Sequence, residues 1–448
     1  MHWRTQIKNA TVVNEGERFV GSVLLDGDRI EEVVRGADVQ PLIPPDRVVD
    51  GTGCYLLPGI IDTHVHFREP GWAYKADIDT ESRAAVAGGV TTIFDMPNTV
   101  PQTVTHEAFD AKLRLMGQKC HVNYGLYFGA TRDNAGELAQ LDPMKVCAIK
   151  LFMGASTGNM LVDADDTLHC IFGNARLPIV AHCEDTAQIE RNMAEAVEAC
   201  GGEPPVGMHT QIRSAQACYD STRKAVRLAR ETGARLHVAH VSTARELELF
   251  DEAYPHVTAE ICLPHLLFCE DDYPRLGTRI KCNPSVKTAA DREALRRALN
   301  HKMVKTVGTD HAPHAIWEKC GGARKAVSGM PMIQYSLVSM LELADAGYLS
   351  LERLVELMCH NPARLFNIEN RGFLREGYQA DLVLVRPHSP WTVTPSRIQS
   401  KCNWSPMEGH VYHWRVERTY VGGFPLYNRG HVTDDDFLGQ AVTYYRCR

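Results

Sequence analysis

The sequence predicts an α/β fold, a (β/α)₈ TIM-type barrel with a small flanking β-sandwich domain built from both chain ends. Short apolar runs rich in β-branched residues recur about eight times over roughly 250 residues, and helical stretches separate most of them. The chain before and after this region reads as strands joined by turns. An open doubly wound sheet has the same rhythm, but no Gly-x-Gly-x-x-Gly follows an early strand to support one.

We expect three segments along the chain. Residues 1–54 are expected to form the N-terminal part of the β-domain, because runs such as FVGSVLLDGDRI carry turn signals between β-like stretches. Residues 55–370 are expected to form the catalytic barrel. Residues 371–448 return to β character at GYQADLVLV and are expected to form the C-terminal part of the β-domain, with a tail.

The expected barrel strands are short and apolar, as strands are when both of their faces are buried. In chain order they are GIIDTHVH, VTTIFDM, VNYGLYF, VCAIKLF, LPIVAHC, RLHVAHV, VTAEICL and VKTVGTD. Stretches with helical character, such as DTESRAAVAGG and SAQACYDSTRKAVRLARETG, lie between most of them. In a parallel barrel the chemistry belongs to the C-terminal ends of the strands, where the βα loops begin.

Composition and charge argue against several classes of function. The 448 residues carry a net charge of −7 and no basic block of the kind that binds nucleic acid. No apolar run approaches the ~18 residues of a membrane span, and the N-terminal MHWRTQIKNATVV lacks the apolar core of a signal peptide. The 14 cysteines are scattered without a Cys-x-x-Cys pair, which favours reduced thiols. We therefore expect a cytoplasmic protein that acts on a small molecule and binds neither nucleic acid nor a membrane.

Side chains that can bind a metal lie at or near the ends of several expected strands. They are His64, His66, Lys150, His182, His240 and Asp310. Strand alternation puts His64 and His66 on one face, so both can point into the barrel mouth. A single histidine at a strand end is usually only a hydrogen-bonded residue, but the set supplies the nitrogen and oxygen donors that suit Zn²⁺. The constellation predicts a catalytic metal site.

Lys150 is the unusual member of this set because it lies in the apolar strand VCAIKLF. An unpaired ammonium is costly to bury, so the alternatives are a snorkelling side chain, a buried ion pair or a lowered pKa that leaves a free amine. A free amine reacts with CO₂ to form a carbamate, an anionic bidentate ligand able to bridge two metals ~3.5–4 Å apart. Beside Zn²⁺ we favour this modification over a cation.

Long motifs in the expected order connect the sequence to a known group. PGIIDTHVHFREPG, AAVAGGVTTIFDMPNT, KLFMGASTGN, VAHCED, LHVAHVST, RIKCNPSVK, GTDHAPH and HNPARLFNIENRG resemble the amidohydrolase superfamily over nearly the whole chain. Within it the chain is most similar to the cyclic amidases, which comprise dihydroorotases, allantoinases and dihydropyrimidinases (hydantoinases). The His-x-His-x-Arg-Glu-Pro-Gly form resembles that of class I-like dihydroorotases, whereas the relatives usually lack the arginine.

The resemblance implies a binuclear zinc centre. One Zn²⁺ would be held by His64, His66 and Asp310 and the other by His182 and His240, with carbamylated Lys150 and a hydroxide bridging both. The resemblance also implies that Asp310 is the general base and then the general acid, which moves the proton of the hydroxide to the leaving amide nitrogen.

One departure from the resemblance concerns the bridging ligand. Many class I dihydroorotases carry an aspartate in that role, in the same loop region. In this sequence Lys150 stands where the superfamily has its carbamylated lysine, and Asp163 and Asp165 follow in the next loop. The two aspartates are alternatives to Lys150, although solvated loop acids are the simpler interpretation.

Arg68 discriminates among the cyclic amides. It lies two residues beyond His66, and a planar guanidinium at the rim of the site suits a substrate carboxylate held by two parallel hydrogen bonds. Dihydroorotate and N-carbamoyl-L-aspartate carry such a carboxylate, whereas allantoin, dihydrouracil and simple hydantoins do not. The alternative is a rim arginine paired with Glu69 or Asp77.

Other substrate contacts follow from the resemblance alone. Asn98, Asn283 and His314 are expected to bind the substrate, although Asn98 is also typical of a turn. The Gly-rich segment 321–331, GGARKAVSGMP, is expected to close over the substrate as a mobile lid. His265 also lies near the mouth and is interpreted as structural.

These inferences converge on a dihydroorotase, which interconverts N-carbamoyl-L-aspartate and L-dihydroorotate in pyrimidine biosynthesis. One alternative is an allantoinase or a hydantoinase-type cyclic amidase, against which Arg68 argues. Another is a non-catalytic scaffold relative, against which the intact ligand set argues. Barrels of this type commonly form dimers or tetramers, so a homo-oligomer is expected.

Overall fold

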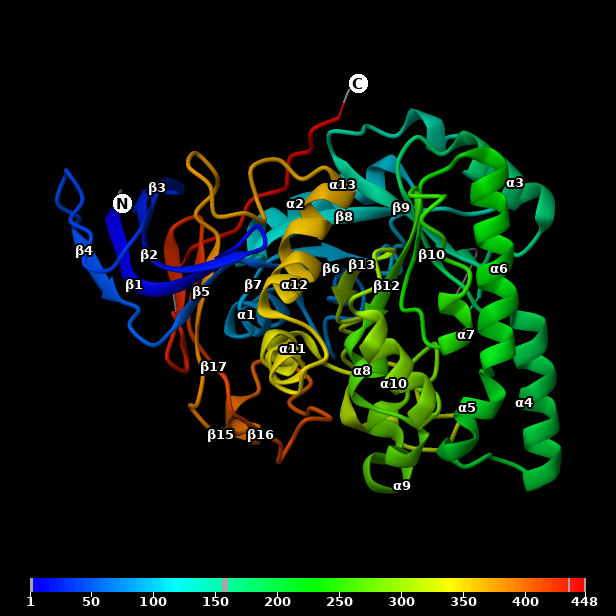
Figure 1. Cartoon of the computed structure of the whole chain (residues 1–448). Coiled ribbons are helices and arrows are strands. Elements are labelled where there is room, and N and C mark those ends of the chain that lie inside the picture. The colour runs from blue at the N-terminus through cyan, green and yellow to red at the C-terminus, as the bar shows by residue number, and fades with distance from the viewer. Residues whose placement is uncertain (1–2, 155–159, 434–435, 447–448) are drawn as a thin grey trace.

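A parallel eight-stranded barrel forms the centre of the computed structural model, which describes residues 3–154, 160–433 and 436–446 (Figure 1). In sheet order the strands are β13 (Val304–Gly308), β12 (Val257–Cys262), β11 (Leu236–Val238), β10 (Ile179–His182), β9 (Val146–Phe152), β8 (Asn123–Gly129), β7 (Val90–Asp95) and β6 (Ile60–Val65). The first and last strands meet where Val65 pairs in parallel with His311 and the His66 N–H donates to the His311 carbonyl (2.8 Å). The predicted barrel is confirmed.

Helices cover the outside of the barrel (Figure 1). The longer ones are α1 (Ile78–Ala87), α2 (His106–Lys119), α3 (Asp165–Asn174), α4 (Thr186–Cys200), α6 (Ala215–Thr232), α10 (Ala289–Ala298) and α11 (Ser336–Asp345). The shorter ones are α5 (His209–Ile212), α7 (Ala244–Leu247), α8 (Leu263–Leu267), α9 (Tyr273–Leu276), α12 (Leu351–Val355) and α13 (Asn361–Phe366). Side-chain caps begin several of them, since Asp77 accepts from Thr80 N at α1 and Ser214 from Ala217 N at α6. Within the described ranges, no helix combines the length and apolarity needed to cross a bilayer.

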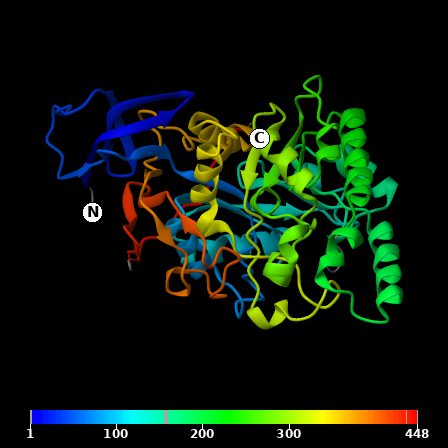
Figure 2. The ribbon, with the colours of Figure 1, turned by 60° about the horizontal axis from the view of Figure 1, so that its bottom comes forward.

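Both chain ends contribute to a second sheet beside the barrel, as predicted (Figures 1 and 2). Its path is β19 (His431–Val432), β18 (Phe424–Asn428), β17 (Arg415–Val421), β14 (Leu382–Arg386), β5 (Tyr55–Pro58), β1 (Arg4–Asn14), β2 (Glu17–Asp26) and β3 (Arg29–Arg35). In addition, β4 (Arg47–Asp50) pairs with β1, while β15 (Trp391–Thr392) and β16 (Val411–Tyr412) pair with each other. The Asp-Gly turn expected in LDGDRI connects β2 to β3, with Gly27 at φ 58°.

Aromatic rings fill a second buried cluster among the barrel strands. Tyr444, from the C-terminal segment, is buried there with Phe94, Tyr127 and Phe366. The same segment runs along the start of β8, where Tyr124 N donates to the Gln440 carbonyl (3.0 Å). None of these four aromatic residues lines the cavity formed at the C-terminal ends of the strands.

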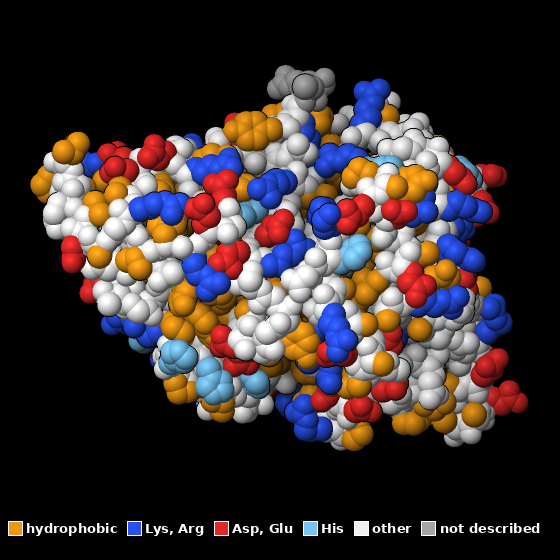
Figure 3. Space-filling view, viewed as in Figure 1, with side chains coloured by type: hydrophobic (Ala, Val, Ile, Leu, Met, Phe, Trp, Pro, Cys, Tyr) orange, Lys and Arg blue, Asp and Glu red, His pale blue; other side chains and the backbone are white. Residues whose placement is uncertain are grey.

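Charged side chains of both signs are interspersed over the face shown in Figure 3, whereas the ion pair between Lys112 and Asp95 is fully buried. Lys112 of α2 places Nζ 2.6 Å from Asp95 Oδ2 at the end of β7, with side-chain exposures of 1% and 0%. Asp95 Oδ1 also accepts from the Phe67 N–H (2.8 Å). The pair therefore supports the chain between His66 and Arg68, which both contribute to the candidate site.

We expect Lys112→Met to lower the free energy of unfolding by about 3–5 kcal/mol, because it leaves the Asp95 carboxylate buried without a counter-charge. Urea unfolding of the purified protein measures this change. Lys302→Met is the matched control, since Lys302 and its partner Glu252 are largely exposed, and it should cost little. Equal costs for the two variants would contradict a stabilising role of the buried pair.

Candidate metal centre and substrate cavity

Six side chains from the ends of five strands surround one cavity. His64 is the next-to-last residue of β6 and His66 follows that strand, Lys150 belongs to β9, His182 ends β10, His240 follows β11 and Asp310 follows β13. All six line a cavity of about 100 Å³ at the C-terminal end of the barrel. The cavity is also lined by Arg68, Asn98 and Asn283, so the structure brings nine of the ten predicted site residues together; the tenth, His314, contacts Arg68.

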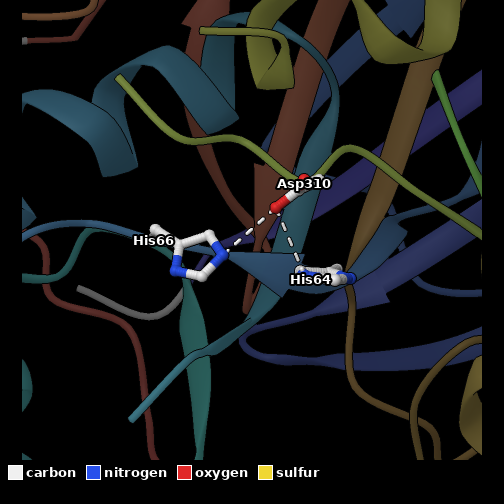
Figure 4. A group of neighbouring side chains, drawn as sticks. All are labelled: His64, His66 and Asp310. Atoms are coloured by element: carbon white, nitrogen blue, oxygen red, sulfur yellow. Dashed lines mark hydrogen bonds and ion pairs between the residues drawn. The ribbon is translucent and has the colours of Figure 1, made fainter. Parts of the chain in front are cut away.

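The first group consists of His64, His66 and Asp310 (Figure 4). Asp310 Oδ1 lies 3.3 Å from His64 Nε2 and 3.1 Å from His66 Nε2. All three are buried or nearly so. Ligand atoms of these residues lie within 4.8 Å of one another, which is a spacing that one metal ion can span.

The second group consists of His182 and His240, whose facing nitrogens, Nδ1 and Nε2, lie 2.8 Å apart. The His240 ring also packs 5.3 Å, centroid to centroid, from the His64 ring of the first group. Burial lowers the pKa of His240 well below its ordinary value, and His182 and His64 lower it further. Burial lowers the pKa of His66 to about 4, so these rings keep a free lone pair at neutral pH.

In three of the histidine rings, one nitrogen donates a hydrogen bond to an oxygen atom of a residue outside the two groups. His64 Nδ1 donates to Glu260 Oε1 (2.6 Å), His66 Nδ1 to Asn98 Oδ1 (2.8 Å) and His182 Nε2 to Glu184 Oε2 (2.8 Å). These bonds fix the tautomers, so the remaining nitrogens point lone pairs at the other members of each group. The inward lone pairs of His64 and His66 and the Asp310 carboxylate repel one another unless a cation lies between them, and the donor set therefore fits a metal centre.

Lys150 Nζ is fully buried and has no hydrogen-bond partner among the described residues. Its Nζ lies 4.9 Å from the centre of the Phe152 ring. Burial lowers the pKa of Lys150, although Glu260 and Asp310 partly oppose it. CO₂ adds to an unprotonated amine to form a carbamate. Lys150 meets this requirement, because its amine has a lowered pKa, has no hydrogen-bond partner among the described residues and lines the cavity of candidate metal ligands.

Asp310 is ionised in this setting. Burial raises the pKa of its carboxyl, but His64, His66 and Lys150 outweigh burial, and the pKa lies well below the ordinary value. The two alternative bridging acids lie elsewhere: Asp163 pairs with Arg132 and Asp165 with Lys224, and neither lines the cavity. Part of the same loop, residues 155–159, lies outside the described residues.

Arg68 lines the cavity, but strand alternation, which was expected to direct its side chain there, does not apply to it. β6 ends at Val65, and Arg68 has φ 66°, in the left-handed region. His240 (φ 39°) and Asp310 (φ 46°) share this unusual backbone, which non-glycine residues adopt at a cost. Strained residues of this kind persist where the surrounding structure holds them, and here three of them line one cavity.

Neither carboxylate suggested as a partner of Arg68 binds it. Glu69 pairs with Lys119 and Asp77 with Lys401, and among the described residues Arg68 forms no ion pair. Arg68 Nε donates to the Pro313 carbonyl (3.0 Å). Burial lowers the pKa of the guanidinium, but only to about 10, so it remains a cation at neutral pH.

His314 separates Arg68 from a second cation. Its Nε2 lies 2.9 Å from Arg68 Nη2 and its Nδ1 lies 3.0 Å from Lys75 Nζ. Burial, then Arg68, lowers the pKa of His314 well below the ordinary value, and a neutral imidazole has only one acceptor nitrogen. His314 Nε2 also lies 3.0 Å from the Ser328 carbonyl, so donation there leaves Nδ1 to accept from Lys75 and leaves Arg68 Nη2 without an acceptor on the ring.

The structure also shows the contacts of Asn283 and His265. Three further buried residues near the cavity were not among the expected site residues. Asn283 Oδ1 lies 3.2 Å from His209 Nε2, and His265 Nε2 donates to the Pro284 carbonyl (3.0 Å). The missed residues are Glu184, Glu260 and Lys75. Charged residues in the apolar runs VAHCED and VTAEICL were a signal for the two glutamates, since a charge inside a buried strand needs a partner.

Comparison with known proteins places these features in a family. The Amidohydrolase family model matches residues 55–404. A dihydroorotase of Halobacterium salinarum is 35% identical over 406 residues, covering 88% of this chain and 90% of the relative. An allantoinase of Bacillus velezensis is 30% identical and covers 95% and 94%. The solved L-hydantoinase (dihydropyrimidinase) of Arthrobacter aurescens superimposes with a TM-score of 0.92 at 29% identity, covering 98% of this chain and all of that one.

The family match spans most of the barrel and all of the residues that line the cavity. The family thus rests on sequence along the chain and, independently, on the shape of the fold. The chain belongs to the amidohydrolase family.

Proposed function

We propose that the protein is a zinc-dependent dihydroorotase, which interconverts N-carbamoyl-L-aspartate and L-dihydroorotate. The observation that carries this proposal is Arg68, a cation on the cavity wall with no carboxylate partner among the described residues. Both substrates bring a carboxylate that can accept two parallel hydrogen bonds from its guanidinium. Dihydroorotases among the similar proteins support the proposal.

The donor set indicates which residues would hold the metals. His64, His66 and Asp310 would bind one Zn²⁺, His182 and His240 the other, and Lys150 as a carbamate would bridge the two. When bound, the metals lower the pKa of water and polarise the amide carbonyl. We assign to Asp310, ionised in the free protein, the transfer of a proton from the attacking water to the amide nitrogen that leaves.

The electrostatics of the cavity wall support an anionic substrate. Arg68 and Lys75 flank the neutral His314, and Glu318, 3.0 Å from Lys75, is the carboxylate paired there. One unit of positive charge therefore stays available on the Arg68 side of the cavity. A substrate carboxylate neutralises it, whereas a neutral ring leaves it buried without a partner.

A hydantoinase-type activity is the second candidate, and Lys150 is the observation that favours it. Many class I dihydroorotases carry an aspartate as the bridging ligand, and this chain carries the lysine of the wider superfamily. The fold is also shared with the L-hydantoinase of Arthrobacter aurescens. The bridging group serves the hydrolytic chemistry common to these enzymes, while Arg68 serves substrate choice, so we rank the carboxylate-binding residue higher.

Ring opening decides between the candidates. We expect the zinc-loaded protein to open dihydroorotate, and to leave allantoin and dihydrouracil intact, when the three are offered separately and the products are separated by chromatography. Turnover of a neutral ring instead would select the second candidate. Absence of turnover with zinc bound would favour a scaffold relative.

Arg68→Met should raise KM for dihydroorotate by about 10- to 100-fold, because a hydrogen bond to a charged group is worth about 1.5–3 kcal/mol. Arg68→Lys should recover only part of the loss, since an ammonium cannot form the planar bidentate pair. Steady-state kinetics and zinc analysis measure both variants, with Arg132→Met as the exposed control. An unchanged KM would remove Arg68 from substrate recognition.

Carbamylation of Lys150 is testable by carbon-13 NMR. Zinc-loaded protein equilibrated with ¹³C-bicarbonate should show a carbamate signal, and Lys150→Arg should abolish it, because a guanidinium keeps its proton and does not add CO₂. Zinc content should fall in the same variant, whereas Lys302→Arg, at an exposed site, should change neither reading. A signal that persists in Lys150→Arg belongs to another amine and contradicts the assignment.

A further inference from the structure

One wall of the cavity is formed by Ser328 and Gly329, within the Gly-rich segment expected to be a lid. Gly329 has φ 132°, and a Cβ on it would lie 2.5 Å from the Ala312 carbonyl, so only glycine fits this close approach. The neighbouring Met330 carbonyl accepts from the Ala312 N–H (3.0 Å), which connects the wall to the end of β13. The position of this wall sets the room left for a substrate beside Asp310.

The buried ammonium group of Lys319 forms hydrogen bonds to the backbone of this wall. Lys319 is 3% exposed, and its Nζ donates to the carbonyls of Gly329 (2.7 Å), Val327 (2.8 Å) and Lys281 (3.2 Å). An ammonium has three donors, and the three carbonyls use all of them. No carboxylate of the described residues forms an ion pair with Lys319, so these carbonyls, with the Trp404 ring 5.9 Å from Nζ to the ring centre, compensate for its burial.

A second lysine holds the same stretch at two points. Lys281 Nζ donates to the Ala326 carbonyl, and the Lys281 carbonyl accepts from the Gly329 N–H (2.8 Å). At the other end of the segment, Glu203 accepts from the N–H groups of Gly322, Arg324 and Lys325 at 2.8–3.0 Å. The segment is thus fastened along its length, and its closure over the substrate as a mobile lid stays a prediction.

Burying two cations side by side is costly, and burial lowers the pKa of Lys319 to about 7 and that of Lys281 to about 8. If this loop only had to be shielded from water, apolar side chains would pack against it at a lower cost in free energy than buried ammonium groups. Unlike apolar side chains, the ammonium groups form directional hydrogen bonds, and each of these bonds fixes the position of one backbone carbonyl.

We propose that Lys319, assisted by Lys281, is a positioning residue that fixes the Ser328–Gly329 wall of the substrate cavity. The proposal deepens the proposed function, since the wall matters through the ring that it confines. It acts through backbone atoms and requires no contact between Lys319 and the substrate. The Ser328 carbonyl, held next to Val327 and Gly329, is the same group that lies 3.0 Å from His314 Nε2, which extends the effect to the Arg68 side of the cavity.

The test compares Lys319→Met and Lys281→Met with the control Lys325→Met, an exposed lysine of the same segment. We expect Lys319→Met to raise KM at least about tenfold with a smaller change in kcat, because a displaced wall misplaces the ring. Lys281→Met should do the same more weakly, and Lys319→Arg should recover part of the loss. Lys325→Met should behave as the parent protein.

Hydrogen exchange of the zinc-loaded protein without substrate separates this proposal from the proposed function. Amides of residues 321–331 should exchange faster in Lys319→Met and Lys281→Met, and this reading holds whichever cyclic amide the parent enzyme opens. Faster exchange with KM within about twofold of the parent would show a purely structural tether and overturn the proposal. Unchanged exchange would overturn it as well. If Lys319→Met does not fold, Lys281→Met decides by the same two readings.

Discussion

The closure of the barrel between β6 and β13 is the constraint on which the site depends. The Thr309 Oγ1–H donates to Asp62 Oδ2 (2.5 Å) across 247 positions of sequence, and the His66 N–H donates to the His311 carbonyl. Burial raises the pKa of Asp62 to about 6, although the hydrogen bonds from Thr309 oppose it. These bonds align the two strand ends, and only that alignment brings Asp310 Oδ1 within 3.1 Å of His66 Nε2.

Much of the site could be predicted because its residues follow the periodicity of the strands. His64, His182 and Asp310 each lie at or beside the end of an apolar run, and parallel strands bring such ends to one edge. Strand alternation failed for Arg68, because the strand ends at Val65 and a turn with positive φ directs the side chain instead. The chemistry of its guanidinium was enough to predict Arg68 as a site residue, but the backbone turn that directs the side chain into the cavity is visible only in the structure.

The contacts of the supporting residues could not be predicted for a different reason. Glu260 meets His64 across 196 positions, and nothing local in VTAEICL states which ring its carboxylate will face. The tethers of the Gly-rich segment could not be predicted either, because Gly-rich composition indicates backbone freedom and carries no information about distant contacts such as that of Lys319. Side chains that act through pairs far apart in sequence become visible only when the strand order is known.

Two buried basic side chains of the cavity respond differently to the same physical effect. Burial disfavours charge on both Arg68 and Lys150. The guanidinium starts from so high a pKa that it stays charged, at about 10, and can neutralise a substrate carboxylate. The amine of Lys150 starts lower, has no hydrogen-bond partner among the described residues, and gives up its proton more readily, which is the state that reacts with CO₂. Exchanging the two residue types would therefore remove both proposed functions, because a lysine at 68 lacks the planar fork and an arginine at 150 cannot become an anionic ligand.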